Sequence, residues 1–322
     1  MNPDNRLLWD GQRRGWLESW YFIIHDPKTR AAFWLRYTLA SPLEGPAFAG
    51  LWAFEFRTDA PPAAAREIFA EGEFRADPFA HDLHIGPGRL TDDSATARIR
   101  GSALATWNLR FKPYPVTYFA APPLVRAFSS SHFSIPTPRT NFTGTVSIAG
   151  RAYSLENAPG CQGHFATPAL GKGWTWAHAT EFAEGPGFAE AVSPGPGIIA
   201  SVGVTWGGRV WPGNTLGALA GGRLEGSDWK RTFRAETVEG PVAWEIEGSP
   251  SRSIGVEYSD PSGNRLYCYN TLVASSTLRC GDKTLHSFGT TVLEISSQLP
   301  RLDVPVSLRA AVAPPPRVSA NH

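Results

Sequence analysis

Large and small side chains alternate in the middle of the chain, between residues 174 and 182. Side chains point to alternate faces of an extended strand, so this period of two predicts a β-strand with one aromatic and one small face. The aromatic face carries Trp174, Trp176, His178, Thr180 and Phe182. A helix would scatter these rings around its circumference. In a closed barrel such a face can line an apolar cavity, which indicates a small apolar ligand.

The same period recurs along the chain and predicts an antiparallel, all-β protein. Residues 16–25 and 31–39 form a predicted hairpin, because an Asp-Pro pair presets the turn between them, and residues 48–57 form a third strand. Further strands are predicted at 97–111, 141–148, 152–155, 163–165, 198–206, 208–211, 242–247, 253–258, 266–271 and 285–295. The alanine-rich residues 61–71 are the single predicted helix, since proline is tolerated in its first turn.

Composition supports two β domains. The 322 residues include 32 glycines and 28 prolines, and 12% are aromatic, which is typical of many turns between aromatic strands. This length is enough for two domains with real cores. We expect two β domains, an N-terminal one at 1–165 and a C-terminal one at 166–312, then a disordered proline-rich tail at 313–322. The breaker-rich residues 184–197 are either a linker or a long hairpin loop.

Net charge and cysteine content limit which binding partners and which cellular compartment we expect. The formal charge is +1, so no strong field exists to hold a nucleic acid or an anionic membrane. No stretch approaches the roughly 20 apolar residues of a membrane helix, and no signal segment is evident. Three cysteines cannot all pair, which favours reduced thiols and a cytoplasmic location. The oligomeric state does not follow from the sequence.

Three titratable residues on predicted aromatic strands are candidates for acid–base chemistry. If His164 and His178 line one apolar cavity, burial would keep both imidazoles neutral and able to donate or accept hydrogen bonds. The alternative is that each ring bonds a backbone group between sheets. Glu18 shares a face with Trp20, where a carboxyl group can have a raised pKa and act as a general acid. Its alternative is a structural ion pair with Arg36 on the facing strand.

Other catalytic signatures are missing from the sequence. Asp77, His81, Asp82 and His84 resemble a metal cluster, but on a strand His81 would point away from Asp82 and His84, so we expect no metal. No dinucleotide or phosphate loop and no nucleophile elbow is present, so we expect no cofactor. Residues 129–132, Ser-Ser-Ser-His, are interpreted as a polar loop without a nucleophile.

Four segments resemble a known family: DLHIGPGRL, ATWNLRFKP, GTVSIAGRAYSLENAPGCQGH and WTWAHATEF. They are similar to the double-calycin proteins related to hydroxyneurosporene synthase, the carotenoid hydratase and AttH-like group, and more distantly to tocopherol cyclase. The resemblance covers residues 16–182 and reaches the second half only through CYNT and TVLEIS. The resemblance implies two tandem lipocalin-like barrels, at 1–165 and 166–312, with a ligand site at or between them. Relatives with assigned activities protonate an isolated alkene and trap the cation with water or an internal hydroxyl, or guide the cyclisation of a polyene. The family pattern His-x-Trp-Gly is replaced here by residues 164–167, His-Phe-Ala-Thr, so the turn after His164 differs.

These features favour a cofactor-independent enzyme that acts on a hydrophobic, terpenoid or polyketide-like small molecule. The reaction class is acid–base assisted hydration, isomerisation or cyclisation, with His164, His178 and Glu18 as catalytic candidates. The alternatives are a carrier that uses the same cavity without chemistry, and an interaction module whose barrels are filled by their own side chains. The ligand-binding candidates are Trp20, Trp34, Trp52, Trp107, Trp174, Trp176 and Phe182.

Overall fold

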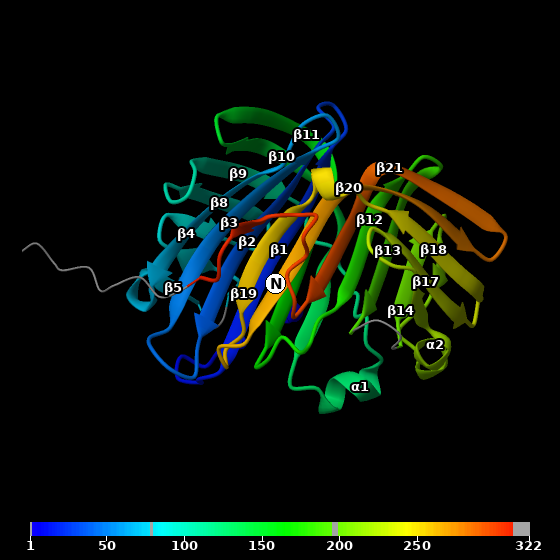
Figure 1. Ribbon diagram of the computed structural model, residues 1–322, viewed down its shortest axis with the longest axis horizontal. Coiled ribbons are helices and arrows are strands. Elements are labelled where there is room, and N and C mark those ends of the chain that lie inside the picture. The colour runs from blue at the N-terminus through cyan, green and yellow to red at the C-terminus, as the bar shows by residue number, and fades with distance from the viewer. Residues whose placement is uncertain (1, 78–79, 195–198, 312–322) are drawn as a thin grey trace, which may run out of the picture.

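A computed structural model describes residues 2–77, 80–194 and 199–311, and it consists almost entirely of β-strands (Figure 1). The strands form two large curled sheets that lie against each other, which confirms the predicted pair of lipocalin-like barrels. Within the described residues each sheet has eleven strands, and every strand pairing there is antiparallel except one short parallel contact between β19 and β22. No helix among the described residues is long and apolar enough to cross a membrane.

The first sheet runs in the order β4-β3-β2-β1-β11-β10-β9-β8-β7-β6-β5. Its strands are β1 (Trp16–Asp26), β2 (Ala31–Ser41), β3 (Phe48–Arg57), β4 (Ala63–Ala70), β5 (Phe74–Ala76), β6 (Leu83–Ile85), β7 (Gly88–Leu90), β8 (Ser94–Ile99), β9 (Ala105–Phe111), β10 (His132–Ile148) and β11 (Arg151–Thr167). Alternate residues of these strands form one buried core, which includes Phe22, Leu51 and Trp107. The short helix α1 (Pro123–Phe128) precedes β10, and the 3₁₀ helix η1 (Pro3–Asn5) precedes β1.

The second sheet follows the order β15-β14-β13-β12-β21-β20-β18-β17-β16, and β19 pairs with β20. Its strands are β12 (Thr175–Phe182), β13 (Gly185–Ser193), β14 (Ser201–Trp206), β15 (Arg209–Trp211), β16 (Arg223–Glu225), β17 (Lys230–Thr237), β18 (Gly240–Glu247), β19 (Ile254–Ser259), β20 (Arg265–Cys280), β21 (Lys283–Ser297) and β22 (Val306–Leu308). A second buried core fills this sheet, and it includes Phe233, Trp244 and Leu278. The helix α2 (Leu216–Gly221) and the 3₁₀ helices η2 (Glu71–Glu73) and η3 (Pro250–Arg252) complete the described elements.

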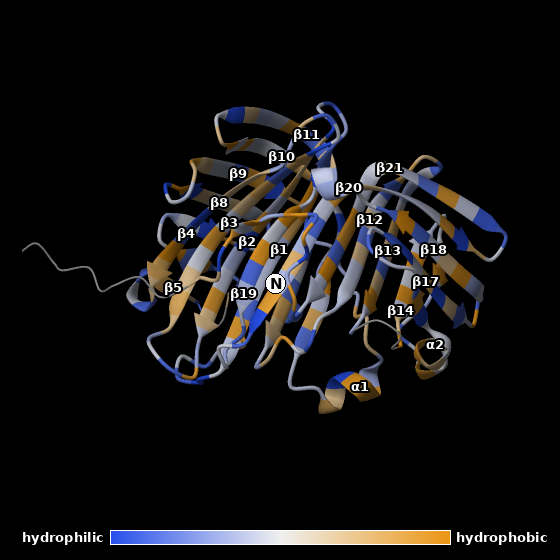
Figure 2. Cartoon of the chain, in the orientation of Figure 1, coloured by the Kyte–Doolittle hydropathy of each residue, from blue (hydrophilic) through white to orange (hydrophobic). Residues whose placement is uncertain are grey.

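A third apolar cluster holds the two sheets together. It combines residues of the first sheet, such as Tyr21 and Trp34, with residues of the second, such as Trp176 and Phe188. Apolar and polar residues alternate along many of these strands (Figure 2). In β1 and β12, which lie where the two sheets meet, both faces are nevertheless buried. The joined sheets therefore behave as layers of one packed body.

The aromatic face of β12 lies in this layer between the sheets. Ala177 and Ala179 face the second core, whereas Trp176 packs with the first sheet. The expectation that the aromatic face lines the inside of a barrel is therefore wrong, because the small face takes the inner position. An irregularity between Ala179 and Glu181 reverses the alternation, and Phe182 packs in the second core.

A glycine permits the contact between β1 and β11. A Cβ atom at Gly163 would lie 2.0 Å from Cζ of Tyr21, so the buried tyrosine ring rests directly on the backbone of β11. Any larger residue would displace the ring from the layer between the sheets.

Three sequence-based expectations about secondary structure are wrong. Residues 61–71 form no helix, because Ala63–Ala70 pairs along β3 as strand β4. The breaker-rich stretch contains strand β13, which pairs with both β12 and β14. The predicted strand at 97–111 is two strands, β8 and β9, joined by a turn. Pairing with a neighbouring strand outweighs local propensity in the first two cases.

Sheet one ends with β11 at Thr167 and sheet two begins with β12 at Thr175. The domain limits 1–165 and 166–312 stay predictions. The predicted tail at 313–322 lies outside the described residues.

Candidate active site

A buried carboxylate–histidine pair lies at one end of the first sheet. Glu18 on β1 and His164 on β11 come from paired strands, and Oε1 of Glu18 lies 2.9 Å from Nε2 of His164. The carboxylate also accepts hydrogen bonds from the backbone N–H groups of Leu8 and Trp9, at 2.8 and 3.0 Å, and from Nε1 of Trp16 at 3.0 Å. Both side chains are fully buried. Four donors therefore satisfy this carboxylate away from water.

The predicted ion pair between Glu18 and Arg36 is wrong. Arg36 lies on the opposite face of the sheet, where its guanidinium carbon is 4.7 Å from the centre of the Trp34 ring. It donates hydrogen bonds to Ser19 Oγ and to the hydroxyl group of Tyr258. Strand alternation explains the error, because adjacent positions on β1 point to opposite faces.

The hydrogen-bond partners of the two ring nitrogens of His164 show where the imidazole carries hydrogen. Nδ1 lies 2.7 Å from the backbone oxygen of Asp4, which can only accept, so Nδ1 carries a hydrogen. A further proton must lie in the hydrogen bond between Nε2 and Glu18, since no other donor fills it. The indole of Trp20 stacks on the imidazole, with ring centres 5.0 Å apart. The Glu18–His164 pair is thus held rigidly and contains one shared proton.

His132, at the start of β10, lies next to this pair. Its ring centre is 5.0 Å from that of His164, and its Nε2 is 2.8 Å from Oγ of Ser134. Burial, and then the positive charge of His164, lower the pKa of His132 to about 4, although the charges of Asp4 and Glu18 oppose this. His132 is therefore neutral near pH 7 and able to accept a proton.

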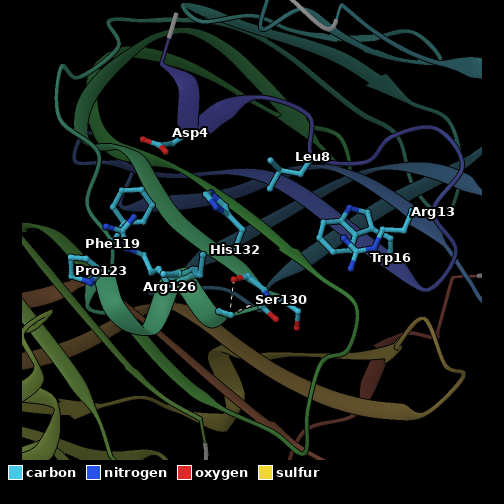
Figure 3. Close-up of a pocket in the computed structure, with 13 residues that line it drawn as sticks. Asp4, Leu8, Arg13, Trp16, Phe119, Pro123, Arg126, Ser130 and His132 are labelled. Carbon is cyan, nitrogen blue, oxygen red and sulfur yellow. Dashed lines mark hydrogen bonds between the residues drawn. The ribbon is translucent and has the colours of Figure 1, made fainter.

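An open pocket of about 620 Å³ gives access to His132 (Figure 3). Its walls include Trp16 from β1, Phe119 from the segment before α1, and the serines at 129–131 that precede β10. His132 lines the pocket, whereas Glu18 and His164 do not. A bound molecule would therefore touch His132 and not the buried pair behind it. The sequence interpretation missed His132 because residues 129–132 read locally as a polar loop, and only the pairing of β10 with β11 places this ring beside His164.

His178 belongs to a different buried pair. Its Nδ1 lies 2.7 Å from Oε2 of Glu190 on β13, and Trp176 donates to the other oxygen of that carboxylate. Burial alone would lower the pKa of His178, but the adjacent Cys161 thiol and the Glu190 carboxylate outweigh burial and raise it. Burial raises the pKa of Glu190. The structure does not bring His164 and His178 into one cavity, because His178 contacts the other face of β11.

The seven aromatic ligand-binding candidates are distributed over three packed regions, and none of them lines the pocket. Trp20 and Trp107 belong to the first core, and Phe182 to the second. The remaining four pack between the sheets: Trp34, Trp52, Trp174 and Trp176. Trp174 also donates a hydrogen bond to Glu294. Their role as ligand contacts stays a prediction.

The metal-like residues do not converge. Asp82 pairs with Arg89 at 2.8 Å and with His84 at 3.1 Å, near the surface. His81 is buried, close enough to His164 for that charge to act on it. Within the described part of the chain, no group of three or more His, Cys, Asp or Glu residues has the arrangement to hold a metal ion. The three cysteines are buried and unbridged.

Two buried histidines predict a loss of stability at mild acidity. Burial lowers the pKa of both His25 and His81 to about 4, from an ordinary value of 6.5. The unfolded chain therefore binds more protons than the folded one between these values. The free energy of unfolding is expected to fall as pH drops from about 6.5 to about 4, by about 2 to 3 kcal/mol for each histidine.

Urea denaturation at a series of pH values measures this effect. His132, whose pKa is also lowered to about 4, adds to the same slope, so the variant His25→Gln should flatten it by about a third, whereas the half-exposed His84→Gln should leave it unchanged. A slope that His25→Gln does not alter would show that this histidine titrates normally in the folded protein.

Comparison with known proteins places this geometry in a recognisable fold. No known family model matches the chain. Two uncharacterized proteins of Mycobacterium tuberculosis, MT0513 and Rv0493c, are 26% identical over 303 residues, covering 87% of this chain and 86% of each relative. An AttH-like protein of Nitrosomonas europaea is similar in structure, with a TM-score of 0.57, 13% identity, and coverage of 93% of this chain and 99% of that one.

Kievitone hydratase from Nectria haematococca is a further structural neighbour. Its TM-score is 0.50 at 10% identity, and the match covers 88% of each chain. These two structures share the double-barrel fold with the protein, in agreement with the fold that the sequence resemblance implied. At such identities the likeness shows the fold alone.

Proposed function

We propose that the protein is a cofactor-independent hydratase that adds water to a carbon–carbon double bond of a hydrophobic small molecule. The observation that carries this proposal is a neutral histidine, His132, on the wall of an open pocket, in ring contact with the buried Glu18–His164 pair. An acid–base group that faces a ligand-sized pocket and has a shifted pKa is the arrangement expected of a catalytic site.

The pKa of His132 indicates the order of proton transfers. With a value of about 4, only about one molecule in a thousand carries the proton at pH 7. This favours activation of water by His132 over initial protonation of an isolated alkene. The oxygen of water then bonds to one alkene carbon while its proton passes to His132. The same proton, returned to the neighbouring carbon, completes the addition and restores the neutral imidazole.

The other two candidates have supporting roles in this proposal. His164 and Glu18 are positioning residues, because they are buried behind His132 and line no part of the pocket. Burial is the main cause of the lowered pKa of His132, and the charge of His164 adds to it, so the position of His164 helps to keep the neighbouring imidazole neutral. His178 has no role in the reaction that we propose.

The fold of kievitone hydratase supports a hydratase over a carrier, since the same double barrel holds such an enzyme. A terpenoid or polyketide-like alkene that is conjugated to a carbonyl group fits a site that activates water first. Such an alkene accepts hydroxide at the carbon remote from the carbonyl, so a neutral base is sufficient.

The test is a screen of such alkenes in oxygen-labelled water, read by mass spectrometry. We expect a product that is heavier by one labelled water molecule, formed without added cofactor and unaffected by chelators. Binding of several alkenes without any labelled product would contradict the proposal and favour the carrier. A product of the same mass as the substrate would instead show that the protein isomerises the alkene by proton transfer, without adding water.

A further inference from the structure

We infer that the pocket binds an aromatic molecule that carries an anionic group, and that Arg126 binds this group. This inference names the substrate class of the pocket and therefore rests on the proposed function. It is tested by binding alone, so its outcome is independent of turnover.

The first observation is the charge of the pocket wall. Two guanidinium groups, those of Arg13 and Arg126, and one carboxylate, that of Asp4, line it together with the neutral His132. Among the residues that the structure describes, neither arginine has an ion-pair partner, and both are exposed. The wall therefore has an excess of positive charge that an anionic ligand would neutralise.

The second observation is that both arginines are stacked on aromatic rings of the same wall. The guanidinium carbon of Arg126 lies 3.7 Å from the ring centre of Phe119, and that of Arg13 lies 3.8 Å from the ring centre of Trp16. Stacking uses the flat face of a guanidinium and leaves its N–H edge free for two parallel hydrogen bonds to an anion. The arginines are thus oriented before any ligand arrives, which lowers the entropy cost of binding.

The third observation is the position of the charges relative to His132. Figure 3 shows His132 between the Phe119–Arg126 pair and the Arg13–Trp16 pair. The rings of Phe119 and Trp16 therefore flank the imidazole, and the remaining wall includes Leu8 and Pro123. A flat molecule anchored through its anion would lie along these rings with its body beside the imidazole. Arg126 is preferred as the anchor because Phe119, its stacking partner, also makes an edge contact with His132, at 6.1 Å between ring centres.

A matched pair of fluorescent probes tests this inference. Anilinonaphthalene sulfonate and phenylnaphthylamine have the same aromatic body, and only the first carries an anion. We expect the native protein to bind the sulfonate about tenfold more tightly than the neutral probe at low salt, a preference that weakens as salt is added.

The variant Arg126→Met should lower the affinity for the sulfonate about tenfold and leave that for the neutral probe within about twofold. The control is Arg98→Met, which changes an exposed arginine beside a separate pocket on the first sheet and should alter neither affinity. The variant Ala127→Trp, which places a bulky ring in the proposed pocket, should abolish binding of both probes and so locate them.

Three results would overturn the inference. The native protein could bind both probes equally well or bind neither of them. Arg126→Met could weaken both probes to the same extent, which would assign it a packing role. Arg98→Met could reduce sulfonate binding as much as Arg126→Met does, which would indicate a general charge effect.

Discussion

Replacement of His132 by glutamine is expected to lower kcat for hydration by about 10² to 10⁴, with little change in KM. Glutamine can still bond to Oγ of Ser134, 2.8 Å from the native ring nitrogen, but it cannot take a proton from water. In the proposed reaction the base is active only when neutral. The rate should therefore rise as pH increases through about 4 and remain level above it. Formation of labelled product at a series of pH values measures both effects.

The variant His164→Gln separates catalysis from positioning. Loss of the positive charge beside His132 should raise the pKa of His132, so the acid limb of the profile should move to higher pH. The half-exposed His84, which pairs with Asp82 outside the pocket, provides the control, and His84→Gln should keep the native profile. If His132→Gln folds normally and keeps its rate within about threefold, chemistry at His132 is excluded and the pocket would act by shape alone.

The period of two in the sequence predicts the antiparallel β class and many of the strands, whereas the pair of barrels was predicted from the family resemblance. Strand β3 has the predicted limits, Phe48–Arg57, and the first hairpin agrees within two residues at each strand end. Strand identity follows from alternation, because each face of a strand meets a different environment. Alternation does not say which face is inside the barrel when both faces are buried. That is why the aromatic face of β12 was assigned to a cavity instead of the layer between the sheets.

Elements that depend on their neighbours were not predictable from local sequence. Ala63–Ala70 has helix-forming composition, and Gly185–Ser193 contains glycine and proline, yet both extend an existing sheet. The backbone hydrogen bonds of β3 and β12 provide a template that a local propensity of a few tenths of a kcal/mol per residue does not overcome.

The candidate site was predictable only in part, for a related reason. Glu18 and His164 were recognised individually as titratable residues in aromatic strands. Their pairing joins residues 146 positions apart, and the place of His132 beside them depends on a third strand. No local pattern contains this information. A histidine two residues from a buried serine at the start of a strand, as His132 is from Ser134, is too common a pattern to identify a site.

The variant Glu18→Ala is expected to lower the free energy of unfolding by about 3 to 5 kcal/mol. The carboxylate is fully buried and accepts hydrogen bonds from the backbone of Leu8 and Trp9, from the indole of Trp16 and from His164. Its removal leaves these donors without a partner and leaves the shared proton of His164 uncompensated. Each unpaired buried donor costs about 1 to 3 kcal/mol, so the loss exceeds that of the methylene groups removed.

The position at which hydrogen exchange accelerates in Glu18→Ala distinguishes lost hydrogen bonds from a simple loss of packing. Glu18 ties residues 8 and 9 to β1, so hydrogen exchange at the amides of Leu8 and Trp9 should accelerate more than exchange in β20 or β21. The control is Glu156→Ala, which removes an exposed partner of Lys28 and should leave both stability and exchange unchanged within error. If Glu18→Ala left the protection of Leu8 and Trp9 intact, the carboxylate would not anchor the segment that closes this end of the first sheet. The buried pair would then contribute to the site through charge alone.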